Sequence, residues 1–473
     1  MRFDSQTFAL RSLDLPAVAD SDGAPLTPDE LWLGKPVPRY TSYPPATLFK
    51  DDIVGAHYVE ALSALEGTEP LSLYLHVPFC RALCLYCGCN TCATSNDMRL
   101  KDYLAATAQE ADRVSALIGR KRPLSRLHFG GGSPNMLSER AMDGLFLALD
   151  KHFCLSSASE IAMELDPRLV TIGQAALLSA CGVTRVSLGV QDFNPAVQKA
   201  IGRVQSFALV ERAVETLREY GIKHISLDLI YGLPLQTPAG IADTAQLALT
   251  LKPDRVALFS YAHVPQAKRH QKALEAFGLP DSYGALAMEQ AARAVFREGG
   301  YEEIGMDHFA KASDSLVEAR DEGRLRRNFQ GYTDDSAKAL LGLGASAIGS
   351  TGSAFFQNER DARAYQDTIW RGRFATVRGL KLTGEDKVRA AIIEELMCTF
   401  SCNIETKCRE HNYALAALAP EMEALEVFEK AGLVAREGYR IRLTSPHRMA
   451  IRVIANVFDS ATRAQNIVTS RAV

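Results

Sequence analysis

Three cysteines lie within eight residues of the segment HVPFCRALCLYCGCN, at Cys80, Cys84 and Cys87. They directly follow an apolar run, residues 71–77, that predicts a β-strand. Cysteine thiolates are the usual ligands of iron–sulfur clusters, and a cubane cluster has one ligand position for each of its irons. Three ligands leave one iron open. The spacing therefore predicts a cluster at the carboxyl end of a strand that can hold a small chelating molecule.

A structural zinc site is the alternative for these cysteines. Zinc sites built on a C-x2-C pair usually bring a second pair roughly 15–20 residues later, but after Cys92 the next cysteine is Cys154. Distant ligands could still complete such a site, so a structural zinc protein without redox chemistry stays open. Cys398 and Cys402 are expected on one helix, as small apolar fillers.

Composition limits the classes of protein that fit. The chain has 473 residues, 47% hydrophobic and 23% charged, which suits a globular protein of two or three domains. A net charge of −3 gives no reason to expect a nucleic-acid partner. No stretch approaches the ~18 apolar residues of a membrane span. The N-terminus lacks the apolar core of an export signal, so we expect a cytoplasmic protein with reduced thiols.

Short apolar runs alternate with amphipathic stretches through the middle of the chain. The runs that predict strands are residues 71–77, 127–129, 161–165, 185–190, 224–230 and 255–260. The stretches between them with helical spacing are residues 98–118, 141–152, 208–220 and 240–251. Strands alternating with helices predict a parallel sheet. The fold class is therefore α/β, an open (β/α)6 version of the TIM barrel, whose chemistry lies at the carboxyl ends of the strands.

Three regions follow from this pattern. Residues 1–70 are expected to form an N-terminal extension, with a helix over 52–65, that lies over a larger domain. Residues 71–375 form the partial barrel, including a barrel-closing segment after a helix over 282–298. Residues 376–473 form a small, mainly helical domain with helices over 384–400 and 417–431 and a strand pair at 433–443. That domain is either winged-helix-like or a helical subdomain that buttresses the barrel.

Glycines and polar residues follow the predicted strands. The segment FGGGSP, residues 129–134, comes after the second strand, and glycines let the main chain approach a ligand closely. Glu164, Gln191 and Asp228 lie at or near the ends of the third, fourth and fifth strands. Such groups are costly to bury without partners, so their repetition at one end of the sheet predicts a single lined site. Arg203 is expected to donate two parallel hydrogen bonds to a carboxylate.

The C-x3-C-x2-C pattern resembles that of the radical S-adenosylmethionine enzymes, and further motifs make the resemblance specific. They are PRYTSYP (38–44), YLHVPFC (74–80), CGCN (87–90), HFGGGSP (128–134), ELDPR (164–168), GVQDF (189–193), DLIYGLP (228–234), GMDHFA (305–310) and RNFQGYT (327–333). Together they resemble the oxygen-independent coproporphyrinogen III oxidases from about residue 36 to the C-terminal helices. Cys89 and PRYTSYP favour this family over the related radical-SAM haem chaperones.

The resemblance implies roles for individual residues. Cys80, Cys84 and Cys87 would bind a [4Fe–4S] cluster, and Cys89, His76 and Tyr74 would support catalysis. Two molecules of S-adenosylmethionine are implied, one on the cluster and one beside it. The residues implied to contact them are Tyr74, Tyr86, Gly131, Gly132, Ser133, Glu164, Gln191, Arg203, Asp228, Ala262 and Ile348. Tyr86 departs from a phenylalanine found in some members but keeps the flat ring for adenine packing.

The implied reaction converts two propionates of coproporphyrinogen III to vinyl groups, giving protoporphyrinogen IX in haem biosynthesis. A 5′-deoxyadenosyl radical from the cofactor removes an unactivated hydrogen, and the protein holds ring and radical together. Arg39, His308, Arg327 and Gln330 are the candidates for substrate contact. The extension over residues 1–70, with Tyr40 and Tyr43, would form a lid over the substrate. The expected partners are the porphyrinogen, an electron donor to the cluster and a terminal electron acceptor, with the protein a monomer. A haem chaperone without turnover is the alternative.

Overall fold

The computed structural model describes residues 27–65, 67–119 and 121–463. All six predicted strands are present and pair in parallel, in the order β9-β8-β7-β6-β4-β1. Their bounds are β1 Leu71–Val77, β4 Arg122–Gly131, β6 Glu160–Leu165, β7 Arg185–Gln191, β8 His224–Tyr231 and β9 Arg255–Ser260. The open (β/α)6 arc predicted from the alternating pattern is therefore confirmed.

Further strands extend the arc at both ends. The antiparallel strands β11 (His308–Lys311) and β10 (Tyr301–Ile304) continue it beyond β9. Beyond β1 the sheet continues through β14 (Leu340–Leu343), β15 (Ile348–Ser350), β16 (Ala354–Asn358) and β17 (Thr376–Lys381). Short pairs form between β2 (Phe79–Cys80) and β3 (Cys92–Ala93), between β12 (Arg326–Asn328) and β13 (Gly331–Thr333), and between β5 (Phe153–Cys154) and β4. Of these additions, β10–β16 belong to the segment that closes the barrel, whereas β2 and β3 belong to the cysteine loop.

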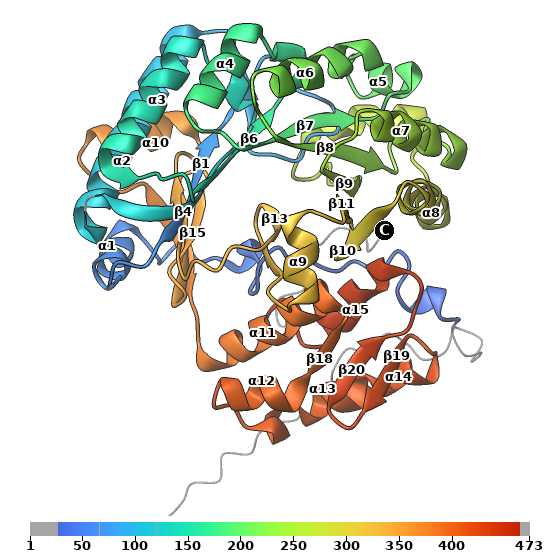
Figure 1. The fold of residues 1–473 in the computed structure, drawn as a ribbon. Coiled ribbons are helices and arrows are strands. Elements are labelled where there is room, and N and C mark those ends of the chain that lie inside the picture. Colours follow the sequence, from blue (N-terminus) through green and yellow to red (C-terminus); the bar gives the residue numbers. More distant parts are fainter. Residues whose placement is uncertain (1–26, 66, 120, 464–473) are drawn as a thin grey trace, which may run out of the picture.

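The helices of the barrel lie along the outer side of the arc (Figure 1). Their bounds are α2 Asp97–Ile118, α3 Glu139–His152, α4 Ile172–Ala180, α5 Pro195–Ala200, α6 Phe207–Glu219, α7 Pro238–Thr250 and α8 Ser282–Glu298. Most begin at a side chain that caps free backbone N–H groups. For example, the Asn96 side chain accepts hydrogen bonds from two backbone amides at the start of α2, and Thr237 caps α7. The sequence predicted four of these helices and α8 but not the short α4 and α5.

The C-terminal elements pack as a separate layer below the arc (Figure 1). They comprise α11 (Gly384–Thr399), α12 (Ile404–Glu410), α13 (Ala419–Ala424), α14 (Glu426–Lys430), α15 (Ile451–Asn456) and α16 (Ser460–Arg463), with a three-stranded antiparallel sheet of β18 (Ser401–Asn403), β20 (Arg440–Leu443) and β19 (Val434–Glu437). The sequence predicted one helix over 417–431, which is wrong because the chain forms two short helices there. Cys402 lies buried on β18 rather than on the helix of Cys398.

Of the predicted extension over residues 1–70, residues 1–26 and 66 lie outside the described residues. The described part, which begins at residue 27, runs between these two layers (Figure 1). It contains α1 (Gly55–Ser63), shorter at both ends than the predicted helix. Tyr40 and Tyr43, expected in a substrate lid, are buried, and the Tyr40 hydroxyl lies 2.9 Å from Asn456 Oδ1 and 3.0 Å from Asp459 Oδ2. Arg452 of α15 donates hydrogen bonds to the backbone carbonyls of residues 37 and 38. This segment therefore ties the C-terminal layer to the barrel.

Inward-facing residues alternate along the strands and line the inside of the arc. On β6, Glu160, Ala162 and Glu164 line this inner cavity, whereas Ile161 packs in the hydrophobic core. The α9 helix (Ser315–Asp321) and α10 (Ala362–Trp370) complete the described helices of this region. Within the described residues, no helix is long and apolar enough to cross a membrane.

The tie between the layers gives a first prediction. Tyr40→Phe removes the hydroxyl that reaches the buried Asp459, so we expect the free energy of unfolding to fall by about 1–3 kcal/mol, the usual cost of leaving a buried polar group without its partner. Urea denaturation measures this. The matched control is Tyr439→Phe, since Tyr439 is exposed; equal stability losses in the two variants would contradict the tie.

Candidate active site

The cysteine loop lies over one end of the arc, between β1 and α2. Cys80, Cys84, Cys87 and Cys89 all line a single cavity. They share it with the glycine turn after β4 and with the polar residues at the ends of β6, β7 and β8. The loop and strand ends that the sequence analysis predicted to form one site are therefore brought together.

The sulfur atoms have polar neighbours that suit metal ligands. Cys80 Sγ lies 3.2 Å from Thr91 Oγ1 and 3.6 Å from Ser133 Oγ. Arg203 Nη1 donates a hydrogen bond of 3.5 Å to Cys84 Sγ. Hydrogen bonds and a nearby cation stabilise thiolates, which are the form of cysteine that binds metal. At Cys80, burial outweighs the two hydrogen bonds and raises the pKa of the thiol. The donor set therefore fits the predicted iron–sulfur cluster.

Cys87 and Cys89 form a hydrogen-bonded pair beside the other two thiols. A hydrogen bond with the Cys89 side chain lowers the pKa of Cys87 to about 6, and the same bond raises the pKa of Cys89 well above its usual value. Cys87 is thus the more readily ionised of the two.

Across the described part of the chain, no three His, Cys, Asp or Glu side chains converge as the ligands of one metal ion would.

The glycine turn is shaped by close packing against the cysteine loop. Gly131 has a φ of +110°, and a Cβ there would collide with the His76 ring. A Cβ on Gly132 would collide with the Phe79 backbone. The Gly131 amide donates a 3.1 Å hydrogen bond to Glu164 Oε2. Only glycine therefore fits at both positions, which leaves main-chain atoms facing the cavity.

Strand-end residues form the opposite wall. Gln191 has a left-handed φ of +68° at an irregularity in the pairing of β7 with β8, which directs it into the cavity. Arg203 donates hydrogen bonds of 2.7 and 3.1 Å to the Gly189 carbonyl and lies 3.6 Å from Asp166. Asp166, which the sequence analysis did not single out, thus forms an ion pair with the Arg203 guanidinium group. Burial, and then the Glu164 charge, raise the pKa of Asp228 to about 7.

A histidine–tyrosine pair lies on β1 below the loop. His76 Nε2 lies 2.9 Å from the Asn90 carbonyl, and His76 Nδ1 lies 2.9 Å from the Tyr74 hydroxyl. Because a carbonyl only accepts, Nε2 carries the hydrogen, and Nδ1 accepts from Tyr74. Burial lowers the pKa of His76, which favours the neutral ring. This pair lines a neighbouring compartment together with Cys89, Gln330 and Ile348.

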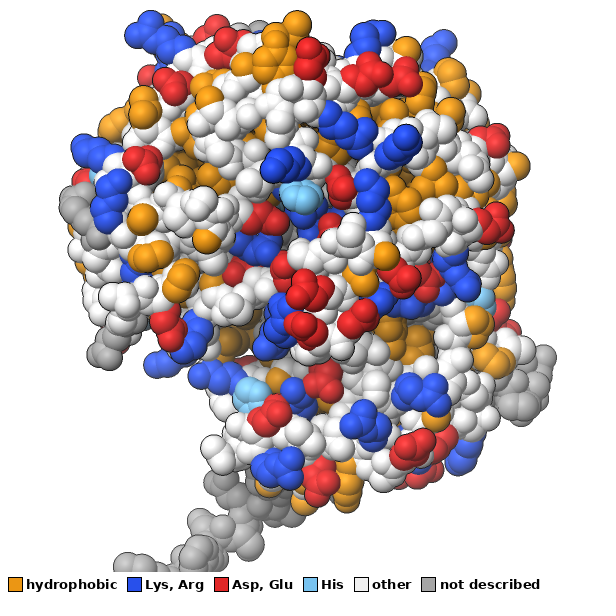
Figure 2. All heavy atoms as spheres, in the orientation of Figure 1, with side chains coloured by type: hydrophobic (Ala, Val, Ile, Leu, Met, Phe, Trp, Pro, Cys, Tyr) orange, Lys and Arg blue, Asp and Glu red, His pale blue; other side chains and the backbone are white. Residues whose placement is uncertain are grey.

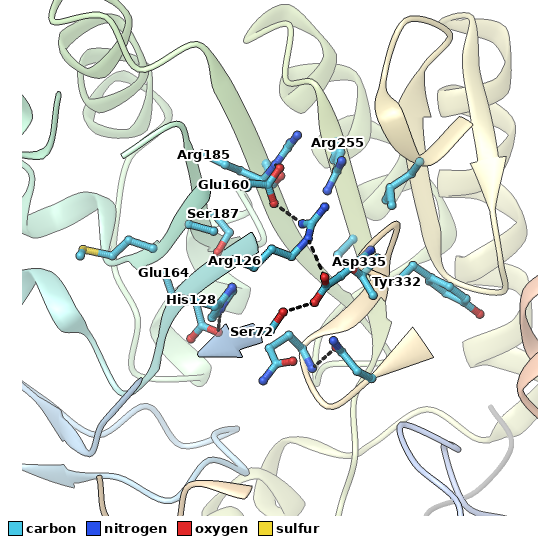
Figure 3. Close-up of a pocket in the computed structure, with 18 of the residues that line it drawn as sticks. Ser72, Arg126, His128, Glu160, Glu164, Arg185, Ser187, Arg255, Tyr332 and Asp335 are labelled. Atoms are coloured by element: carbon cyan, nitrogen blue, oxygen red, sulfur yellow. Dashed lines mark hydrogen bonds and ion pairs between the residues drawn. The ribbon is translucent and has the colours of Figure 1, made fainter. Parts of the chain in front are cut away.

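A second, connected cavity runs from Glu164 toward the amino ends of the strands (Figure 3). His128, which the sequence analysis missed, lies 3.2 Å from Glu164 Oε1 and stacks on the Tyr74 ring. At the far end, inward-facing Arg126, Arg185 and Arg255 form a charged floor. Their ion-pair partners are Glu160, Asp314, Asp334 and Asp335. Figure 2 shows acidic and basic side chains gathered around a hollow on this face.

The candidate substrate residues Arg39, His308 and Arg327 surround Asp307. His308 Nδ1 lies 2.6 Å and Arg327 Nη1 3.9 Å from Asp307 Oδ1. Despite burial, Arg327, His308 and Arg39 hold the pKa of Asp307 at about 2. The Arg327 side chain is only 4% exposed, and its Nε and Nη1 atoms have no hydrogen-bond partner. The sequence analysis missed Asp307, although it precedes His308 in GMDHFA.

Two predicted residues stand apart from the cavity walls. Ala262 is not among the residues lining the cavities described above, and its carbonyl accepts a 3.1 Å hydrogen bond from Gln271. Arg39 Nη2 donates a 2.5 Å hydrogen bond to the Ser260 carbonyl at the end of β9. Tyr86 lines the cavity beside Cys84, as expected. Most of the predicted set therefore meets at one end of the arc.

Comparisons with known proteins agree with this arrangement. Residues 74–248 match the Radical SAM superfamily. The oxygen-independent coproporphyrinogen III oxidase of Bradyrhizobium diazoefficiens is 41% identical over 437 residues, covering 92% of this chain and 97% of that protein. The protein of the same name from Pseudomonas aeruginosa is 39% identical, covering 89% and 93%. The solved structure of coproporphyrinogen III oxidase (HemN) from Escherichia coli, a radical SAM enzyme, superimposes with a TM-score of 0.85 at 36% identity, covering 89% of this chain and 97% of that chain.

The raised pKa of Asp228 predicts a specific dependence of stability on pH. A carboxyl whose pKa rises from about 4 in the unfolded chain to about 7 on folding binds more protons when folded, so stability falls as pH rises between these values. Asp228→Asn removes this loss. Because the side chain is only partly buried, we expect the wild type to lose roughly 2 kcal/mol more than this variant between pH 4 and 8.

Urea denaturation at several pH values measures this difference. Asp243→Asn is the matched control, since Asp243 is exposed on α7. It should follow the wild-type pH profile. Identical profiles for the wild type and Asp228→Asn would contradict the assignment.

Proposed function

Because this chain belongs to the family of oxygen-independent coproporphyrinogen III oxidases, we propose that the cavity below its cysteine loop converts two propionates of coproporphyrinogen III to vinyl groups. The product is protoporphyrinogen IX, and each propionate loses carbon dioxide, one hydrogen atom and one electron. The observation that carries the proposal is the shared cavity of three cysteines, the glycine turn and the strand-end polar residues.

The family and superfamily imply a [4Fe–4S] cluster and S-adenosylmethionine as cofactors. When bound, they supply the one-electron chemistry that removes an unactivated hydrogen from the propionate, which no side-chain base can do. Cys80, Cys84 and Cys87 would hold the cluster. Gly131, Gly132 and Ser133 would present main-chain and hydroxyl groups to the methionine end of the cofactor. The protein's part is to bind, orient and exclude water.

Two molecules of S-adenosylmethionine would occupy adjoining compartments. The first compartment is lined by residues near the cysteines and the second by Tyr74, His76 and Ile348. Glu164, Gly131 and Cys89 line both compartments. The residues proposed to contact these molecules are Tyr74, Tyr86, Gly131, Gly132, Ser133, Glu164, Gln191, Arg203, Asp228, Ala262 and Ile348. The adjoining position of the compartments supports binding two molecules side by side.

Cys89, Tyr74 and His76 are the proposed catalytic residues. Cys89 is exposed to the cavity between the two compartments. The Tyr74 hydroxyl donates to His76 Nδ1, and His76 donates in turn to a backbone carbonyl. This chain of hydrogen bonds holds the neutral imidazole in one orientation and directs the Tyr74 hydroxyl beside the second compartment, which supports a role for the pair in orienting the reacting groups.

Arg39, His308, Arg327 and Gln330 are the proposed substrate contacts. A coproporphyrinogen carries four propionates, and buried guanidinium groups recognise carboxylates well. One buried acid, Asp307, faces two arginines and a histidine. This group of side chains therefore carries a net positive charge. The Nε and Nη1 atoms of Arg327 donate no hydrogen bond within the protein, which supports pairing with a propionate beside the 3.9 Å ion pair of Nη1 with Asp307.

The protein would act with an electron donor to the cluster and a separate terminal electron acceptor, because each decarboxylation releases one electron. We propose that it works as a monomer in the cytoplasm, where its thiols stay reduced.

The cysteine assignments predict distinct outcomes for two classes of variant. Cys80→Ser, Cys84→Ser or Cys87→Ser should abolish the cluster, because each removes a ligand. Cys89→Ser should keep the iron, the sulfide and the broad visible absorption of the cluster but lose turnover. Anaerobic reconstitution with metal and sulfide analysis measures whether each variant holds the cluster. Formation of protoporphyrinogen IX with 5′-deoxyadenosine measures turnover.

Three results of this assay would count against the proposals. Loss of cluster iron in Cys89→Ser would reassign the fourth thiol as a ligand. Stoichiometric haem capture by the wild type without decarboxylation would favour a haem chaperone. Binding of zinc in place of iron and sulfide would reject the redox chemistry altogether.

The carboxylate assignment predicts that Arg327→Gln raises KM for coproporphyrinogen III about 10–100-fold, the loss expected for a charge-assisted hydrogen bond. The matched control is Arg326→Gln, since the neighbouring Arg326 side chain is 60% exposed. Steady-state assays should show little change in its KM. An unchanged KM in Arg327→Gln would show that Arg327 does not bind a propionate and has a structural role.

A further inference from the structure

The cysteine loop is held from outside by the segment that follows β9. Three side chains at the start of the 3-10 helix Arg269–Phe277, or just before it, each donate a hydrogen bond to a carbonyl of the loop. The bonds are Lys268 Nζ to the Cys89 carbonyl at 2.7 Å, His270 Nε2 to the Cys87 carbonyl at 2.8 Å, and Gln271 Nε2 to the Tyr86 carbonyl at 2.9 Å. Nothing in the sequence motifs pointed to these three residues.

Gln271 uses most of its hydrogen-bonding capacity in this contact. It is fully buried, its Nε2 also donates to the Ala262 carbonyl at 3.1 Å, and its Oε1 accepts from the Val264 amide at 2.7 Å. One side chain thus joins the cysteine loop to the chain leaving β9. Because a buried amide with few free positions has little freedom to move, this joint is stiff.

The engaged carbonyls also fix the direction of the peptide groups near the thiols. A peptide unit is planar, and its N–H points opposite to its C=O. The bond from His270 to the Cys87 carbonyl therefore turns the following Gly88 N–H to the other side of the loop. Hydrogen bonds to the sulfurs and the charge nearby are among the factors that set the reduction potential of an iron–sulfur cluster.

We infer that Lys268, His270 and Gln271 form a clamp that positions the cysteine loop and so sets the reduction potential and lifetime of its cluster. This inference rests on the proposed function for the cluster itself. The three are positioning residues, since they contact main-chain carbonyls of the loop. Lys268 adds a positive charge, which favours the more negative, reduced cluster.

The first test uses the protein before any cluster is added. In Lys268→Met combined with His270→Leu, hydrogen exchange of the hydrogen-bonded amides of Leu85, Cys87 and Thr91 should become about tenfold faster, because two hydrogen bonds that hold the loop are lost. Lys272→Met is the matched control, since Lys272 is exposed on the same helix. Exchange equal to that of the control would overturn the clamp.

The second test measures the reconstituted cluster by redox titration followed by electron paramagnetic resonance. Lys268→Met should shift the midpoint potential to a more negative value than Lys272→Met and shorten the half-life of the cluster. Lys268→Arg, which keeps a charged donor, should restore both. A potential that is the same in Lys268→Met and Lys272→Met would overturn the inference.

The two tests separate this inference from the proposed function. Failure of the wild type to assemble an iron–sulfur cluster would reject the proposed function, while the exchange experiment would still decide whether the clamp exists. A normal wild-type cluster with unchanged exchange and potential in the variants would reject the clamp alone.

Discussion

The site depends on the parallel pairing of β1 with β4. In their register, His76 lies opposite Gly130 and Val77 opposite Gly131. This places the His76 ring in the space that a side chain on Gly131 would fill, and the Phe79 backbone against Gly132. The Gly132 amide then donates to the Val77 carbonyl and the Ser133 amide to the Phe79 carbonyl, each at 2.8 Å. A shift by one residue would turn each of these side chains to the opposite face.

The pairing joins the two parts of the chain that do the chemistry. The cysteine loop leaves β1 and the glycine turn leaves β4, so one register fixes the distance between thiols and main-chain amides. Glu164 of β6 then contacts two residues of β4, since its carboxylate accepts a hydrogen bond from the Gly131 amide and lies beside His128. The histidine, the carboxylate and the glycine turn thus form one hydrogen-bonded unit.

Sequence reasoning predicted the elements whose signal is local. The apolar runs revealed every strand of the arc, and the cysteine spacing and glycine turn identified the end where the site lies. The strand predicted at 127–129 is longer in the structure because Arg126 and Ser125 interrupt the apolar run yet face the interior. A polar residue that points into a lined cavity looks, in sequence, like the end of a strand.

The residues that were missed act through long-range contacts. Asp307 matters because Arg39 and Arg327 reach it from distant segments, and Lys268 matters because the segment after β9 folds back onto the cysteine loop. Neither spacing nor periodicity encodes such contacts. The helix predicted over 417–431 is two short helices that meet at Leu425, and Pro420 lies in the first turn of the first of them, where proline is tolerated.

The charged floor has a consequence for how this fold can be divided. Its three arginines come from the arc strands β4, β7 and β9, but Asp314, Asp334 and Asp335 come from the later, barrel-closing segment. A fragment cut after the sixth strand would keep three guanidinium groups in its lumen with Glu160 as their remaining floor carboxylate. Uncompensated interior charge is strongly destabilising. We therefore expect a fragment that ends after the sixth strand to be less stable than one that extends past residue 335, well beyond the superfamily match at 74–248.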